Sequence, residues 1–143
     1  MLPTSDPSSA SVLVAVVGSL NVDLVSFTSR IPHAGETLSS DAFTTGWGGK
    51  GANQAVATAR LASSLESPPA LRSGTEGTSS TIDITVKMFG AVGDDDFGPS
   101  LKKALDAEHV DTADVRVVEN QRTGVAVIIV RSFTLQSVYF ASY

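Results

Sequence analysis

Apolar residues form one unbroken run near the start of the chain and alternate with polar residues in several later segments. Residues 12–17 are all aliphatic and end at Gly18, a pattern typical of a strand covered on both faces in a parallel sheet. We therefore expect this run to be the first, central strand. A period of two over residues 82–89 predicts another strand, and the apolar runs 115–118 and 124–130 predict two more.

Helical spacing and turn residues divide the rest of the chain. Residues 20–45, with a turn at residues 32–35, predict a hairpin exposed on one side. The glycine-rich segment 46–51 is followed by alanine and valine at helical spacing, so it opens a helix. The acidic loop 93–98 precedes a second helix that carries Leu101, Ala104 and Leu105. This order predicts an α/β fold in which helices flank a parallel central sheet.

Three segments lack the pattern of a packed element. Twelve of the eighteen residues from 63 to 80 are Ser, Thr, Gly or Pro, which predicts an inserted surface loop. Residues 1–11 are expected to be a disordered N-terminus, and residues 132–143 carry no charge and form a divergent tail. The expected domain therefore covers residues 12–131.

Composition excludes several classes of function. The 143 residues suit one domain, and the formal charge of −5, without a basic stripe, argues against a nucleic-acid partner. The chain has no cysteine and two distant histidines, so we expect no disulfide and no metal site. The longest apolar run is too short to span a bilayer. These observations favour a cytoplasmic protein without a membrane or nucleic-acid partner.

The glycine-rich segment is the first candidate binding site. Gly46, Gly48 and Gly51 satisfy the dinucleotide pattern G-x-G-x-x-G, but a hairpin separates them from the first strand, which disfavours that interpretation. Backbone N–H groups, together with Lys50 and Asn53, would converge at a helix N-terminus and suit an oxygen-rich ligand. The alternative is a glycine turn with a solvated lysine.

Asn21 and Asp23 form a second candidate site. In an extended segment, residues two apart point to the same side, and this pair follows the first strand, where open α/β sheets bind ligands. A carboxylate accepts two hydrogen bonds from a diol, and an amide both donates and accepts, so the pair suits a sugar. A polar turn after a strand is the alternative.

The remaining polar candidates have simpler interpretations. The acidic run 94–96 precedes a helix and is expected to cap its N-terminus rather than bind magnesium. His33 and His109 are expected to be exposed, and Trp47 to make a packing or lid contact. No catalytic residue is assigned within the chain.

The candidate sites belong to a larger ordered set of motifs, formed by residues 18–23, 32–37, 48–55, 90–98 and 123–126. In this order they resemble the ribokinases of the phosphofructokinase B-type carbohydrate kinase family. The resemblance runs from about residue 14 to residue 130. It implies an incomplete ribokinase-like fold: a parallel central sheet with flanking helices and a β-hairpin lid.

The resemblance also implies roles for particular residues. It assigns Asn21, Asp23, Gly49, Lys50 and Asn53 to contacts with a pentose such as ribose. It assigns residues 20–45, together with strands near 115–130, to a lid over the sugar, through which two copies of the chain form a homodimer.

In the same family the catalytic aspartate, its G-A-G-D loop and the ATP site lie in the distal half of the protein, and no G-A-G-D sequence occurs here. Mg-ATP and a monovalent cation would therefore bind only in the full-length enzyme. That enzyme is expected to phosphorylate ribose or a related sugar, and this chain to carry the sugar-binding half and to be inactive alone. The alternatives are a non-catalytic module that interacts through the lid and a fragment that does not accumulate.

Overall fold

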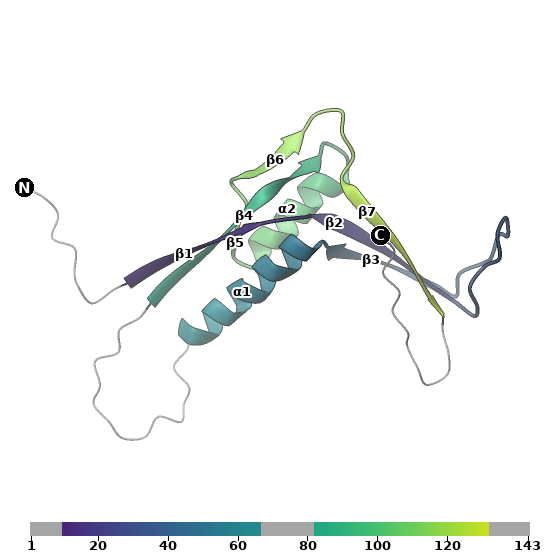
Figure 1. Ribbon diagram of the computed structural model, residues 1–143, viewed down its shortest axis with the longest axis horizontal. Helices are drawn as coiled ribbons and strands as arrows, with labels where there is room; N and C mark the ends of the chain where they lie inside the picture. The colour runs from purple at the N-terminus through teal and green to yellow at the C-terminus, as the bar shows by residue number, and fades with distance from the viewer. Residues whose placement is uncertain (1–9, 67–81, 132–143) are drawn as a thin grey trace, which may run out of the picture.

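The computed structural model describes residues 10–66 and 82–131, which form two sheets and two helices (Figure 1). The expected α/β class is confirmed. In chain order the elements are β1 (Ala10–Val17), β2 (Asn21–Thr28), β3 (Ala42–Gly48), α1 (Lys50–Glu66), β4 (Ile82–Gly93), α2 (Phe97–Ala107), β5 (Val110–Asp111), β6 (Val115–Val118) and β7 (Gly124–Arg131).

The main sheet is parallel throughout, as expected. β4 pairs with β1 along its first eight residues, with β5 at residues 86–87 and with β6 along residues 90–93. β5 has two residues, too few to show a period of two in the sequence, so it was not predicted.

The core lies between this sheet and the two helices. Met88 and Leu101 are completely buried, and Leu105 is nearly so. α1 faces the core with a stripe of alanines, whose small side chains let the helix approach the sheet closely. The members of the stripe are Ala52, Ala55, Ala59 and Ala62. These residues lie at the spacing that predicted the helix.

The second sheet has the order β3-β2-β7 and projects from the main sheet (Figure 1). We call it the lid sheet. The predicted hairpin is confirmed: β2 pairs antiparallel with β3, and β7 adds to the other side of β2 in parallel. At the hairpin turn, Glu36 pairs with Arg30 and accepts a hydrogen bond from the His33 N–H at 2.8 Å.

The expectation that both late strands belong to the lid is wrong for one of them. β7 joins the lid sheet, but β6 pairs with β4 in the main sheet. The reason is burial, because Val115 at the start of β6 is 2% exposed and packs in the main core.

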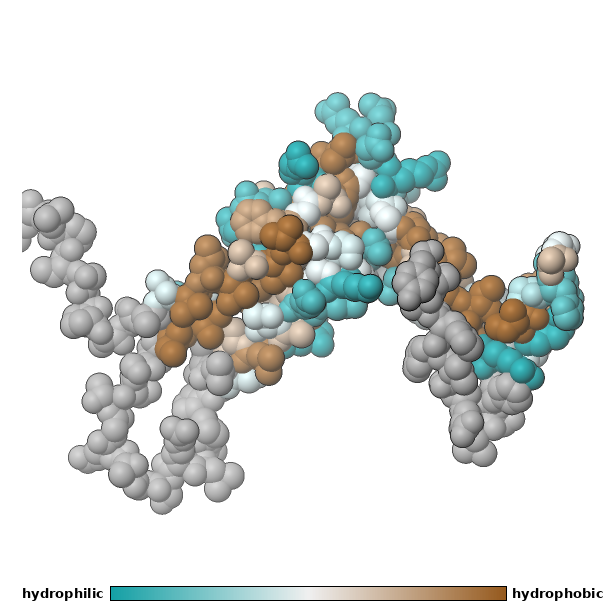
Figure 2. Space-filling view, viewed as in Figure 1, coloured by the Kyte–Doolittle hydropathy of each residue, from teal (hydrophilic) through white to brown (hydrophobic). Residues whose placement is uncertain are grey.

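β1 differs from its prediction as a covered, central strand. Among the described residues it pairs with β4 alone, and Leu13 and Val17 are 62% and 80% exposed. Hydrophobic atoms accordingly gather on the surface along β1 (Figure 2). Its aliphatic run fits a strand buried on both faces, yet the described residues cover only the face that carries Val14 and Val16.

Two element boundaries also differ from expectation. α1 continues to Glu66, so the loop expected from residue 63 does not begin there. Ser63 and Ser64 fit the helix because their hydroxyls donate to the carbonyls of Ala59 and Arg60. β1 begins at Ala10, inside the segment expected to be disordered.

Residues 1–9, 67–81 and 132–143 lie outside the described part. The disordered terminus, the rest of the inserted loop and the divergent tail therefore stay predictions. Neither helix within residues 10–66 and 82–131 is long and apolar enough to cross a membrane.

Candidate functional site

The glycine-rich segment is mostly strand rather than loop. Gly46 and Gly48 belong to β3, and Gly49, at φ +99°, alone turns the chain into α1. A Cβ on Gly49 would lie 2.8 Å from the carbonyl carbon of Ser19 and 2.9 Å from the amide nitrogen of Asn21. The β3–α1 turn therefore packs directly against the β1–β2 turn.

Ser19, whose role sequence reasoning missed, lies beside the N-terminus of α1 and accepts hydrogen bonds from it. Its hydroxyl accepts the Lys50 N–H at 3.0 Å, and its carbonyl accepts the Ala52 N–H at 3.2 Å. These two helix N-terminal donors, expected to face a ligand, are therefore used within the protein. No local pattern indicates that a serine caps a helix that begins 31 residues later.

Asn21 and Asp23 lie on the same face of β2, as predicted. The strand register places Asn21 opposite Gly48 on β3 and Gly124 on β7. It places Asp23 opposite Gly46 and Ala126 in the same way. Both polar side chains are therefore flanked by the smallest residues available, which leaves room for a ligand at this part of the lid sheet.

The flanking glycines are in close contact with the two polar side chains. A Cβ on Gly48 would lie 2.7 Å from Oδ1 of Asp23, and a Cβ on Gly124 would lie 3.3 Å from Cγ of Asn21. Sequence reasoning missed this role of Gly48 and Gly124, because strand register is not visible in the spacing of single residues.

The other predicted site residues lie near this junction but on α1. Lys50 is exposed at the first position of the helix, next to Gly49. Asn53 is also exposed, and it lines a hollow of about 560 Å³ together with Trp47, Arg60 and residues of α2. Trp47 pairs with Val22, on the opposite face of the lid sheet from Asp23. The structure thus gathers Asn21, Asp23 and Gly49, with Lys50 adjoining them, whereas Asn53 borders a neighbouring hollow.

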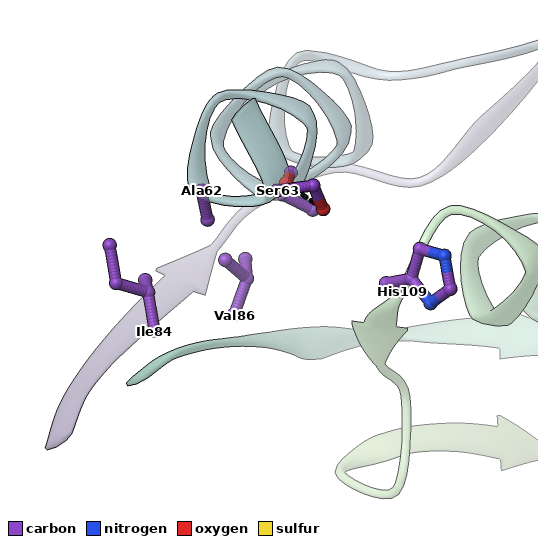
Figure 3. A pocket seen from close by; sticks show the side chains of 6 residues that line it. Ala62, Ser63, Ile84, Val86 and His109 are labelled. Atoms are coloured by element: carbon purple, nitrogen blue, oxygen red, sulfur yellow. Dashed lines mark hydrogen bonds between the residues drawn. The ribbon is translucent and has the colours of Figure 1, made fainter. Parts of the chain in front are cut away.

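A second hollow, of about 240 Å³, lies between α1 and β4 (Figure 3). Ile84 and Val86 of β4 face Ala62 of α1 across it, and the Ser63 hydroxyl donates to the Ala59 carbonyl. His109 borders it at the end of α2 and is exposed, as expected. This hollow contains none of the predicted site residues.

The acidic loop before α2 binds protein donors rather than facing an ion. Asp94 accepts the Asn120 N–H, and Asp95 accepts the Gly98 N–H at 3.1 Å and both the N–H and the hydroxyl of Thr123, at 2.9 and 2.7 Å. The capping role is confirmed at Asp95, whereas the side chain of Asp96 makes no cap hydrogen bond. The Thr123 hydroxyl and N–H lower the pKa of Asp95 below its ordinary value of 3.8.

Within the acidic loop, one oxygen of Asp94 and both oxygens of Asp95 are thus engaged by backbone and hydroxyl donors of the protein. This is the arrangement expected of a capping loop.

The chain is similar to sugar kinases in sequence. A model of the pfkB family of carbohydrate kinases matches residues 12–142. The chain is 44% identical over 119 residues to a ribokinase of Schizosaccharomyces pombe, covering 82% of this chain and 32% of that protein. It is 37% identical over 125 residues to a deoxyribokinase of Salmonella typhi, covering 87% and 34% respectively.

Solved structures show the same likeness. Ribokinase of Arabidopsis thaliana, complexed with ribose and ATP, superimposes with a TM-score of 0.63 at 32% identity, covering 93% of this chain and 36% of that one. Ribokinase of Cryptococcus neoformans, in complex with ADP, gives a TM-score of 0.59 at 30% identity, covering 93% and 34%. The chain thus spans about a third of the length of these relatives. Because the family model matches residues 12–142, nearly the whole chain, the chain belongs to the pfkB family of carbohydrate kinases.

Proposed function

We propose that this chain forms the sugar-binding part of a ribokinase-type, ATP-dependent sugar kinase, and that it binds ribose or a related pentose. One observation carries the proposal: Asn21 and Asp23 share a face of the lid sheet whose neighbouring positions are Gly48, Gly124, Gly46 and Ala126. No large side chain at these positions competes with a ligand for the two polar groups.

The chemistry of the pair suits vicinal hydroxyls. The Asp23 carboxylate accepts hydrogen bonds from two hydroxyls, and the Asn21 amide both donates and accepts. The small flanking residues let a sugar ring approach the backbone closely. Gly49 and Lys50 would contribute from the start of α1, where the lysine adds a cationic donor for a sugar oxygen. Asn53 would add an amide from the edge of the neighbouring hollow.

The complete reaction needs more than the described residues offer. Phosphoryl transfer from Mg-ATP requires groups that hold the phosphates and orient the acceptor hydroxyl. Within the acidic loop, Asp94 and Asp95 accept hydrogen bonds from donors of the protein itself. We therefore propose that Mg-ATP, and a monovalent cation, bind to a part of the full-length enzyme outside this chain. A coupled assay should then detect no ribose-dependent ATP turnover by the chain alone, and robust turnover would contradict this division.

Sugar binding is tested by titrating ribose into the purified chain by calorimetry or NMR. We expect Asp23→Ala to weaken binding at least about tenfold, because it removes a charged hydrogen-bond acceptor. The control is Asp83→Asn, which also removes one negative charge. Asp83 lies near the start of β4 in the main sheet, where it pairs with Ser11 of β1, outside the proposed sugar site. Equal affinities for wild type, Asp23→Ala and Asp83→Asn would contradict the proposal.

The role of Lys50 needs a separate variant. Lys50→Met keeps the length of the side chain and removes its charge. If the ammonium serves a sugar oxygen, affinity falls; if affinity is unchanged, the lysine is merely solvated and the proposed site does not include it.

We also propose that two copies of the chain associate through the lid sheet. The face opposite Asp23 exposes a group of large apolar side chains: Phe43, Trp47, Val125 and Val127. Such a patch is typical of a contact surface. Light scattering should report a dimer for wild type and a monomer for Phe43→Ser combined with Val127→Ser; a monomeric wild type would contradict it. The cytoplasmic location stays a prediction.

A further inference from the structure

The turn from β6 to β7 connects the main sheet to the lid sheet, and a compact network fastens it. Asp95, beside the start of α2, accepts hydrogen bonds from the N–H and the hydroxyl of Thr123. The same hydroxyl accepts the Gly93 N–H at 3.0 Å, and Thr123 is 3% exposed. Thr123, the last residue before β7, is therefore fixed by three hydrogen bonds: one to Gly93 at the end of β4 and two to Asp95 in the acidic loop.

The backbone of Gly93 packs so closely against residues 121–123 that position 93 has no room for a side chain. A Cβ on Gly93 would lie 2.6 Å from the Thr123 nitrogen and 2.7 Å from the carbonyl carbon of Arg122. The start of β7 therefore has little freedom to move while the Asp95–Thr123 bonds are intact.

The network leads directly to the proposed sugar site. Gly124 follows Thr123, pairs with Asn21 and lies against the side chain of that residue. A displacement of Thr123 would therefore displace Gly124 and change the position of the Asn21 amide. Small displacements of ligand-binding groups reduce affinity strongly, since hydrogen bonds depend steeply on geometry.

We propose that Asp95 and Thr123 are positioning residues for the sugar site: they fasten the start of β7 to the main sheet and so hold Gly124 against Asn21. The proposal rests on the sugar-binding function proposed above. Neither residue needs to touch the sugar.

Four substitutions separate positioning from general stability. Asp95→Asn replaces the charged carboxylate that accepts the Thr123 hydroxyl by a neutral amide, which weakens this hydrogen bond. Thr123→Val keeps the side-chain volume but leaves the Gly93 N–H without its acceptor. Thr123→Ser retains the hydroxyl and is the rescue variant. Asp96→Asn is the matched control, because it changes the neighbouring carboxylate, which makes no cap hydrogen bond.

The experiment records the Asn21 side-chain amide and the Gly124 backbone N–H by NMR in each variant, followed by titration with ribose. We expect Asp95→Asn and Thr123→Val to shift both signals and to weaken ribose binding about tenfold. Thr123→Ser and Asp96→Asn should leave the affinity within about twofold of wild type. If Asp95→Asn fails to fold, the comparison of Thr123→Val with Thr123→Ser provides the same test.

Unchanged Asn21 and Gly124 signals in Asp95→Asn and Thr123→Val would overturn the inference, as would shifted signals with undiminished ribose affinity. If the wild-type chain binds no ribose, the proposed function fails instead. The NMR signals then still decide whether the network positions Asn21, so the two failures are distinguishable.

Discussion

The carboxylate of Asp23 on β2 lies against the Cα atom of Gly48 on β3, in space that any side chain at position 48 would occupy. Gly46, the register partner of Asp23, is more distant, since a Cβ there would lie 3.9 Å from the Cβ of Asp23. Of these two glycines on β3, only Gly48 therefore has to lack a side chain for the Asp23 carboxylate to keep its position.

This difference predicts opposite outcomes for two alanine substitutions. Gly48→Ala should leave the fold intact, because the carboxylate can rotate away, but it should weaken ribose binding by moving that group. Gly46→Ala places its Cβ at an ordinary contact distance and should preserve the affinity. Calorimetric titration and thermal unfolding of both variants check this. Equal affinities for the two variants would show that the carboxylate position is unimportant.

Gly49 should be the least replaceable glycine of the junction. Its φ of +99° disfavours any side chain, and the neighbouring atoms of Ser19 and Asn21 are backbone and cannot rotate away. Gly35→Ala is the control, since φ is +77° there but nothing lies within 4 Å. We expect Gly35→Ala to cost about 1–2 kcal/mol of unfolding free energy and Gly49→Ala distinctly more. Urea unfolding measures both, and a smaller cost at Gly49 would contradict the packing described.

The stability of the chain should depend on pH through Asp95. The Thr123 hydrogen bonds hold the pKa of this carboxyl below its ordinary value of 3.8 in the folded state. The unfolded state therefore binds the proton more readily, so the stabilisation is present above the ordinary value and is lost as pH falls through the lower, folded value. The difference in unfolding free energy between wild type and Asp95→Asn should shrink from near neutral pH toward about pH 2. Urea unfolding across this range checks it, and a difference independent of pH would contradict it.

Met88 connects the core to the glycine junction. It is completely buried, and its Cε atom would lie 2.8 Å from a Cβ on Gly51 in the first turn of α1. Met88→Ala should lower the unfolding free energy by about 2–5 kcal/mol through loss of packing. Leu61→Ala, at a side chain that is 67% exposed, should change it by less than about 0.5 kcal/mol. Similar costs in urea unfolding would place Met88 outside the core.

Much of the fold followed from periodicity and turn chemistry. The aliphatic run, the hairpin and both helices were predicted because each contains its own pattern of apolar positions. Asn21 and Asp23 were expected on one face because they lie two residues apart in an extended segment. These are local properties, and local properties are what a single sequence expresses most directly.

The features that were missed are relations between distant segments. Ser19 binds the start of a helix that follows a whole hairpin, and Gly124 contacts Asn21 across more than a hundred residues. The assignment of β6 to the main sheet depends on burial of Val115, which its short apolar run does not reveal. Exposure of β1 depends on what lies beside it, which is not a property of its own residues.

The exposed edge of β1 has a kinetic consequence for handling the protein. Among the described residues this strand has one partner, so the backbone groups along its other edge are available to a second chain. The fraction of molecules that unfold per unit time does not depend on protein concentration, because unfolding involves one molecule. The rate at which two β1 edges pair rises with the square of the protein concentration, because pairing involves two. The time for which the chain stays monomeric in solution would then depend on protein concentration as much as on temperature.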